Sequence, residues 1–143
     1  MVLAAQPVLK WGAHLFFYGY VLALVAAGAF GMLLAPVDAR YLLGLDVTHL
    51  QPLTAATTLS QYRFLRAIEA GLGVSLLVLR GEIYRERRFN RLFLAVMAGG
   101  IAARLIGLVF DGRPAWSQLF FLALELIGIV LIFLYTRTTV GPR

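Results

Sequence analysis

The sequence contains no cysteine, and it has few charged residues for its length. Without cysteine, disulfides, thiolate nucleophiles, iron–sulfur clusters and thiol-ligated zinc are all excluded. Only 14% of the 143 residues are charged, against about 25% in a soluble domain. So few charges cannot cover a water-facing surface. A soluble enzyme, a disordered tail and a fibrous repeat are therefore excluded.

Apolar residues take the place of the missing charges. They make up 61% of the chain, and the mean hydropathy is +0.83. These values predict an all-α integral membrane protein with a single domain over residues 1–143. At about 20 residues per span, the length allows four spans, and we expect a four-helix bundle. The expected helices cover about 11–35, 61–79, 90–110 and 114–136, and the outer loop segment 36–60 is expected to lie partly at the membrane interface.

Lysine and arginine are distributed unevenly between the two sides of this bundle. One side holds eight of them and the loops of the other side hold two. The eight are Lys10, Arg80, Arg85, Arg87, Arg88, Arg91, Arg137 and Arg143, and the two are Arg40 and Arg113. By the positive-inside rule, both termini are expected in the cytoplasm, with the protein in a bacterial-type inner membrane. The net charge of +6 then reflects topology, and we expect no nucleic-acid partner.

Charged residues inside the expected helices fall at similar depths. At 1.5 Å per residue, Glu69 lies about 12 Å, Arg104 about 10 Å and Glu125 about 16 Å from the outer ends of their helices. Arg66 lies one turn before Glu69 on the same helix face, and Arg63 precedes both. Intramembrane charges face the bundle interior or a wet cavity and usually pair. We therefore expect Arg104 to reach Glu69 or Glu125.

Two interpretations of this charged cluster remain open. It could be a structural network of ion pairs that fixes the order of the helices, or it could line an outward-facing polar pocket or proton-linked site.

Small residues recur every four positions on the third expected helix, at Ala95, Gly99, Ala103 and Gly107. Such a face lets another helix approach closely. We expect packing inside the chain, with the shorter pair Ala67 and Gly71 as a possible partner. Formation of a homodimer or of a larger membrane complex is the alternative.

No metal or cofactor site can be assembled from the sequence. His14 and His49 lie on opposite sides of the expected bilayer, and no metal-ligand spacing or phosphate-binding glycine loop is present. The arginine-rich connection 80–91 is expected to anchor the topology, and contact with anionic lipid headgroups is the alternative. Membrane lipids are the expected partners.

Three segments resemble an uncharacterised bacterial family of small four-helix membrane proteins that is akin to the DoxX-like group. They are Tyr62-Arg63-Phe64-Leu65-Arg66 with Glu69 and Gly71-x-Gly73, then Arg104 to Asp111-Gly112, and Leu124-Glu125-Leu126-Ile127-Gly128. The resemblance covers about residues 10–137, supports the four-helix bundle and draws attention to Arg66, Arg104 and Glu125. It implies no settled activity, although some DoxX-like relatives are linked to quinone-coupled redox systems.

Three functions therefore compete. The first is a non-enzymatic accessory protein or a binder of a lipid-like molecule, which needs a bundle, a polar pocket and a packing face. The second is a small proton-coupled transporter that uses a membrane-embedded carboxylate. The third is a membrane enzyme that acts on lipid or quinone, with Glu69 or Glu125 as general acid or base.

Overall fold

The computed structural model describes residues 6–140, and every regular element in this range is helical. Four helices are long: α1 (Gln6–Leu33), α3 (Pro52–Val78), α5 (Arg87–Phe110) and α6 (Trp116–Thr139). Three elements are short: α2 (Ala35–Leu43), the 3-10 helix Val47–His49 and α4 (Arg80–Arg85). Arg143, one of the basic residues counted above, lies outside the described residues.

Three of the long helices, α1, α5 and α6, are long and apolar enough to cross a membrane. This composition supports a membrane protein. The remaining long helix, α3, is not among them, and it carries Arg63, Arg66 and Glu69 near its middle.

The segment 36–60, expected as an outer loop, is largely helical. Pro36 has no backbone N–H and its ring obstructs the preceding turn, so the chain leaves α1 and starts again as α2. Gly44 ends α2 with a φ of +69°, and its N–H reaches the carbonyl oxygen of Arg40 at 3.1 Å. Pro52 then occupies the first turn of α3, which begins nine residues earlier than the expected residue 61. A proline in the first turn favours the start of a helix at a position where the polar composition predicts a loop.

Between α2 and α3, Asp46 caps the 3-10 helix. Its Oδ1 accepts hydrogen bonds from the hydroxyl of Thr48 at 2.6 Å and from the backbone N–H of Thr48 at 3.0 Å. These bonds favour the ionised carboxylate and hold the pKa of Asp46 below its usual value.

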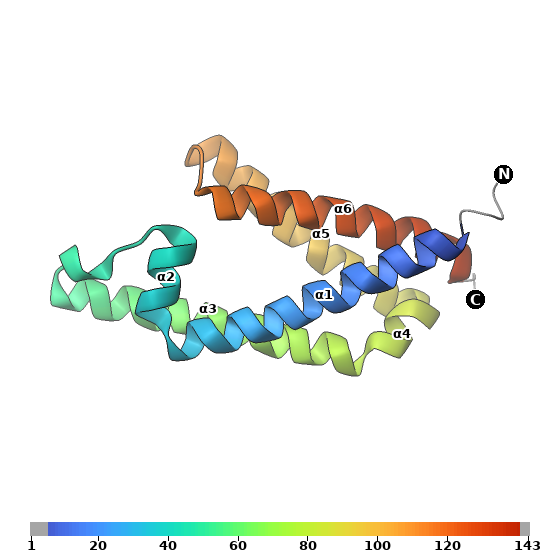
Figure 1. Cartoon of the computed structure of the whole chain (residues 1–143), viewed down its shortest axis with the longest axis horizontal. Helices are drawn as coiled ribbons and strands as arrows, with labels where there is room; N and C mark the ends of the chain where they lie inside the picture. The colour runs from blue at the N-terminus through green and yellow to red at the C-terminus, as the bar shows by residue number, and fades with distance from the viewer. Residues whose placement is uncertain (1–5, 141–143) are drawn as a thin grey trace.

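The most extensive helix contact is between α1 and α3, and α6 packs against both α1 and α5 (Figure 1). Two glycines allow the backbones of α1 and α3 to approach closely. A Cβ at Gly28 of α1 would lie 2.6 Å from the backbone nitrogen of Ala70, and a Cβ at Gly73 of α3 would lie 2.7 Å from a methyl of Val25. A third close contact joins α1 to α6, where the ring of Phe16 covers Gly128. These three glycines thus set how closely the long helices pack.

The hydrophobic core lies at the end of the molecule where α1 begins and α6 ends (Figure 1). It draws side chains from all four long helices and from α4: Ala13, Phe17, Val21, Leu76, Ile83, Phe93, Met97 and Ile132. Toward the other end α1 and α3 diverge from α5 and α6, and α2 lies between them (Figure 1). There the hydroxyl of Ser117 on α6 donates a hydrogen bond of 2.8 Å to the carbonyl oxygen of Leu42 on α2.

Candidate functional site

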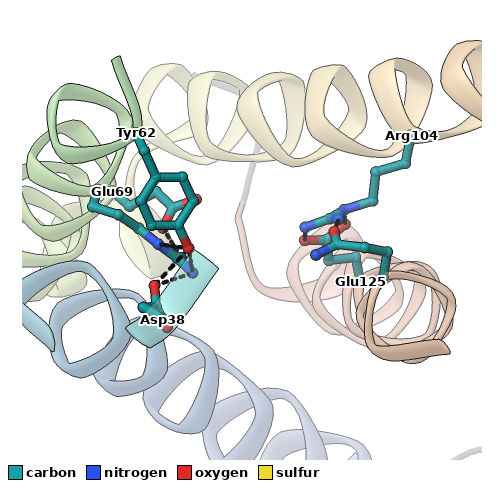
Figure 2. Close-up of polar contacts among 7 residues, drawn as sticks. Asp38, Tyr62, Glu69, Arg104 and Glu125 are labelled. Carbon is teal, nitrogen blue, oxygen red and sulfur yellow. Dashed lines mark hydrogen bonds and ion pairs between the residues drawn. The ribbon is translucent and has the colours of Figure 1, made fainter. Parts of the chain in front are cut away.

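Two groups of charged side chains face each other across a cavity of about 310 Å³ (Figure 2). The first group comes from α2 and α3, and the second from α5 and α6. We call them the α2–α3 cluster (Asp38, Tyr62, Arg66 and Glu69) and the α5–α6 cluster (Arg104, Gln118 and Glu125). Side chains of α1 complete the cavity wall.

Arg66 is the centre of the α2–α3 cluster. Its guanidinium lies 2.7 Å from Oδ2 of Asp38 and 2.5 Å from Oε2 of Glu69. It also donates two hydrogen bonds, of 3.0 and 2.8 Å, to the hydroxyl of Tyr62, and that hydroxyl donates to Asp38 at 2.6 Å. The side chains of Arg66 and Asp38 are only 8% and 11% exposed. Because burial removes hydration from both ions, these contacts are needed to hold them there.

Gly31 of α1 provides the space for this cluster. A Cβ at this position would lie 2.6 Å from Cγ and Nε of Arg66, and it would also overlap a carboxylate oxygen of Asp38. Any side chain larger than hydrogen would therefore displace the ion pair.

The α5–α6 cluster joins its two helices through Arg104. Nε of Arg104 donates to Oε2 of Glu125 at 2.9 Å, and Nη2 donates to Oε1 at 3.3 Å, which is a two-pronged contact that suits the planar guanidinium. Nη1 donates to the side-chain oxygen of Gln118. Glu125 is 10% exposed and Arg104 is 32% exposed, so the carboxylate is the more deeply buried partner.

The sequence-predicted charged residues thus divide into two groups. Arg104 contacts Glu125, one of its two expected partners, while Glu69 contacts Arg66 on its own helix. Arg63 is exposed and does not line the cavity.

Three members of the clusters were not anticipated: Asp38, Tyr62 and Gln118. The sequence predicts a loop at Asp38, and Tyr62 and Gln118 carry no charge that would mark them. The spacing Tyr62-x-x-x-Arg66 was an available signal, because residues four apart share a helix face.

The small-residue ladder of α5 does not pack inside the chain as expected. Ala95, Gly99 and Ala103 are exposed, and a Cβ at Gly99 or at the suggested partner Gly71 would meet nothing within 4 Å. Glycines of α1, α3 and α6 make the close contacts instead, because α5 turns its larger residues Phe93, Met97 and Ile101 inward.

The chemistry of the cavity is mixed. Its charged groups are the three carboxylates and two guanidiniums of the clusters, each of which already contacts a group of opposite charge. Apolar side chains, including Leu24, Leu65 and Phe121, line the rest. A pocket of this size with few convergent polar groups is typical of a small-molecule site. Within residues 6–140 no group of histidine and acidic side chains is arranged to hold a metal ion.

Comparison with known proteins assigns a family and no activity. The family described as a domain of unknown function (DUF4345) matches residues 13–136, which includes both clusters, all of α3 and α5, and most of α1 and α6. Neither the curated proteins nor the solved structures contain a significant match.

Proposed function

The chain belongs to the DUF4345 family, a domain of unknown function, and we propose that it is a non-enzymatic membrane protein that binds a lipid-like molecule. The single observation that carries the proposal is the cavity of about 310 Å³ between the two clusters. Its apolar walls suit a hydrocarbon or ring system. Its hydroxyl, amide and carboxylate groups suit a headgroup that forms hydrogen bonds.

The charge pairing disfavours an anionic headgroup, and we propose an uncharged one. Both guanidiniums of the cavity are already bound to carboxylates, so an anionic ligand would have to break an existing ion pair. The same pairing gives less support to a proton-coupled transporter, since Glu69 and Glu125 are each held by an arginine. An enzyme acting on lipid or quinone would also need one of these carboxylates released before it could transfer a proton.

The proposal includes a four-helix bundle in the membrane, with α3 as the fourth span. The 27 residues of α3 extend about 40 Å, which is enough to cross a bilayer. Its buried charge, Arg66, is enclosed by α1 and α2, so the helix does not present it to lipid.

The eight-to-two distribution of basic residues supports cytoplasmic termini in a bacterial inner membrane, and the DoxX-like resemblance supports the same architecture. Cysteine labelling tests this topology in the cysteine-free chain. A membrane-impermeant maleimide applied from outside should label a cysteine that replaces Asp46, and should not label one that replaces Glu86. Labelling at position 86 would contradict the topology.

A homodimer or larger complex through the exposed ladder of α5 also belongs to the proposal. Exposed small residues permit close helix contact in lipid. A cysteine at Gly99 should cross-link between chains in the native membrane, while one at Ala98, which is also exposed on α5 but points about 100° away from the ladder, should not. Equal cross-linking at both positions would count against the ladder.

Ligand binding is tested with a matched pair of alanines on α1. Ala23 lines the cavity, whereas Ala26 is exposed on the same helix and does not line it. We expect Ala23→Phe to fill the cavity and to abolish binding of decylubiquinone and monoolein, two uncharged amphiphiles, measured by native mass spectrometry. Ala26→Phe should bind as the wild type does. Equal binding by both variants, or none by the wild type, would refute the proposal.

A further inference from the structure

A second hollow lies at the opposite end of the molecule from the clusters. It is a groove of about 390 Å³ between the start of α5 and the end of α6. Its lining includes three arginines, Arg87, Arg91 and Arg137, with Leu94 and Phe133 beside them. We call these five residues the arginine groove.

Helix geometry selects these arginines from the larger basic set. Arg87 and Arg91 lie four residues apart on one face of α5, and Leu94 continues that face. Arg137 lies four residues after Phe133 on α6, which runs antiparallel to α5. Arg85 and Arg88 belong to the same basic connection and do not line the groove. The groove therefore gathers guanidiniums from two helices at one level.

The groove is strongly cationic. No carboxylate lines it, and none of its three arginines forms an ion pair with another residue of the described range 6–140. The neutral polar groups in its wall are already engaged. The amide of Asn90 donates a hydrogen bond of 3.1 Å to the backbone carbonyl oxygen of Ile83. The hydroxyl of Thr136 donates one of 2.8 Å to the backbone carbonyl oxygen of Ile132. The guanidiniums are the groups left to bind a ligand.

We propose that the arginine groove binds the phosphate headgroup of an anionic phospholipid. Arginine suits phosphate because its planar donors can contact two oxygens at once. The lipid is favoured over a soluble anion because α5 and α6 are both able to span a membrane, and the groove lies where both helices end. Leu94 and the exposed Phe133 then lie on the membrane side of the arginines, where an acyl chain would run. Basic side chains at this level attract anionic headgroups.

The test compares two double variants that remove the same charge. Arg87→Gln with Arg91→Gln removes two arginines of the groove, and Arg85→Gln with Arg88→Gln removes two outside it. Binding of dioleoylphosphatidylglycerol to the full-length protein in detergent is measured by native mass spectrometry, with dioleoylphosphatidylcholine and inorganic phosphate as the other probes. We expect about 25-fold weaker phosphatidylglycerol binding for the groove variant, from about fivefold per arginine, and less than about threefold for the control.

Three results would overturn the proposal. Equal weakening by both double variants would mean that only the total charge matters. Equal affinity for phosphatidylcholine would mean that the anionic headgroup is not recognised. Phosphate binding as tight as that of the lipid would assign the groove to a free anion.

Arg137→Gln, on the other helix, provides an independent check if the double variant misfolds, and we expect about fivefold weaker binding. No weakening in a folded Arg137→Gln protein would also refute the proposal. Ala23→Phe, which fills the distant cavity, should leave phosphatidylglycerol binding unchanged. The proposal for the arginine groove and the proposal for the ligand cavity can therefore be refuted independently.

Discussion

Removing Arg66 is the sharpest test of the α2–α3 cluster. Arg66→Met keeps much of the side-chain volume and deletes the charge, which leaves the buried carboxylate of Asp38 and the half-exposed carboxylate of Glu69 without a counter-ion. Breaking a buried ion pair from one side costs about 3–5 kcal/mol. Because Asp38 is buried, we expect Arg66→Met to destabilise the protein by an amount in that range. Glu69 is partly exposed to solvent, so its loss of a counter-ion contributes less to the total.

The partner substitution should cost less, for a reason visible in the structure. Asp38→Asn leaves Arg66 bound to Glu69 and to the hydroxyl of Tyr62, so the guanidinium keeps a counter-ion. We expect about 1–3 kcal/mol for this change. The double variant should cost less than the sum of the two single variants, because no buried charge is then left alone in the Asp38 position.

Reversible unfolding in mixed micelles of dodecyl sulfate and a mild detergent measures these free energies. Arg63→Met is the matched control, because Arg63 is an exposed arginine one turn earlier on the same helix, and we expect a change within about 0.5 kcal/mol. If Arg66→Met is no more destabilising than Arg63→Met, the cluster contributes nothing to stability and the reasoning is wrong.

Two further predictions concern the same cavity. Gly31→Ala should destabilise the protein by about 1–3 kcal/mol in the same unfolding assay, because its Cβ would collide with Arg66. Gly19→Ala is the control on the same helix, because its Cβ would meet nothing within 4 Å, and it should be neutral or stabilising. If both variants lower the free energy of unfolding equally, the collision with Arg66 is not the cause. In a double-mutant cycle with Arg104→Met and Glu125→Gln, we expect a coupling energy of about 1–3 kcal/mol, and simple additivity would mean that the ion pair contributes no stability.

The contact between Arg104 and Glu125 could be predicted because both residues lie inside regular helices. A constant rise per residue converts sequence position into depth, and an arginine at that depth requires a partner. The same reasoning could not choose between Glu69 and Glu125, because depth says nothing about which helices are neighbours. In the structure α5, which carries Arg104, packs against α6, which carries Glu125, and this contact decides the partner.

Asp38 and the helix-packing glycines show where such reasoning fails. The position of Asp38 depends on the reversal at Pro36, which folds α2 back against α3, and a break in a helix has no regular rise to extrapolate. Small residues on a helix face indicate that another helix can approach it closely, but they do not indicate which of several such faces makes the contact. The ladder of α5 is the more regular pattern, yet Gly28 and Gly73 are the residues at the close contact.

The position of the apolar core at one end has a mechanical consequence for the other end. Met97, which lies in the core, is seven residues from Arg104, so about 10 Å of α5 separates the two residues along the helix axis. A rotation of about 6° around the core would move Arg104 by about 1 Å, which is enough to lengthen a hydrogen bond of 2.9 Å beyond its normal range. Phe17 and Phe93 lie in this core and do not line the cavity, so a substitution that shifts their packing should change the width of the cavity without altering its walls.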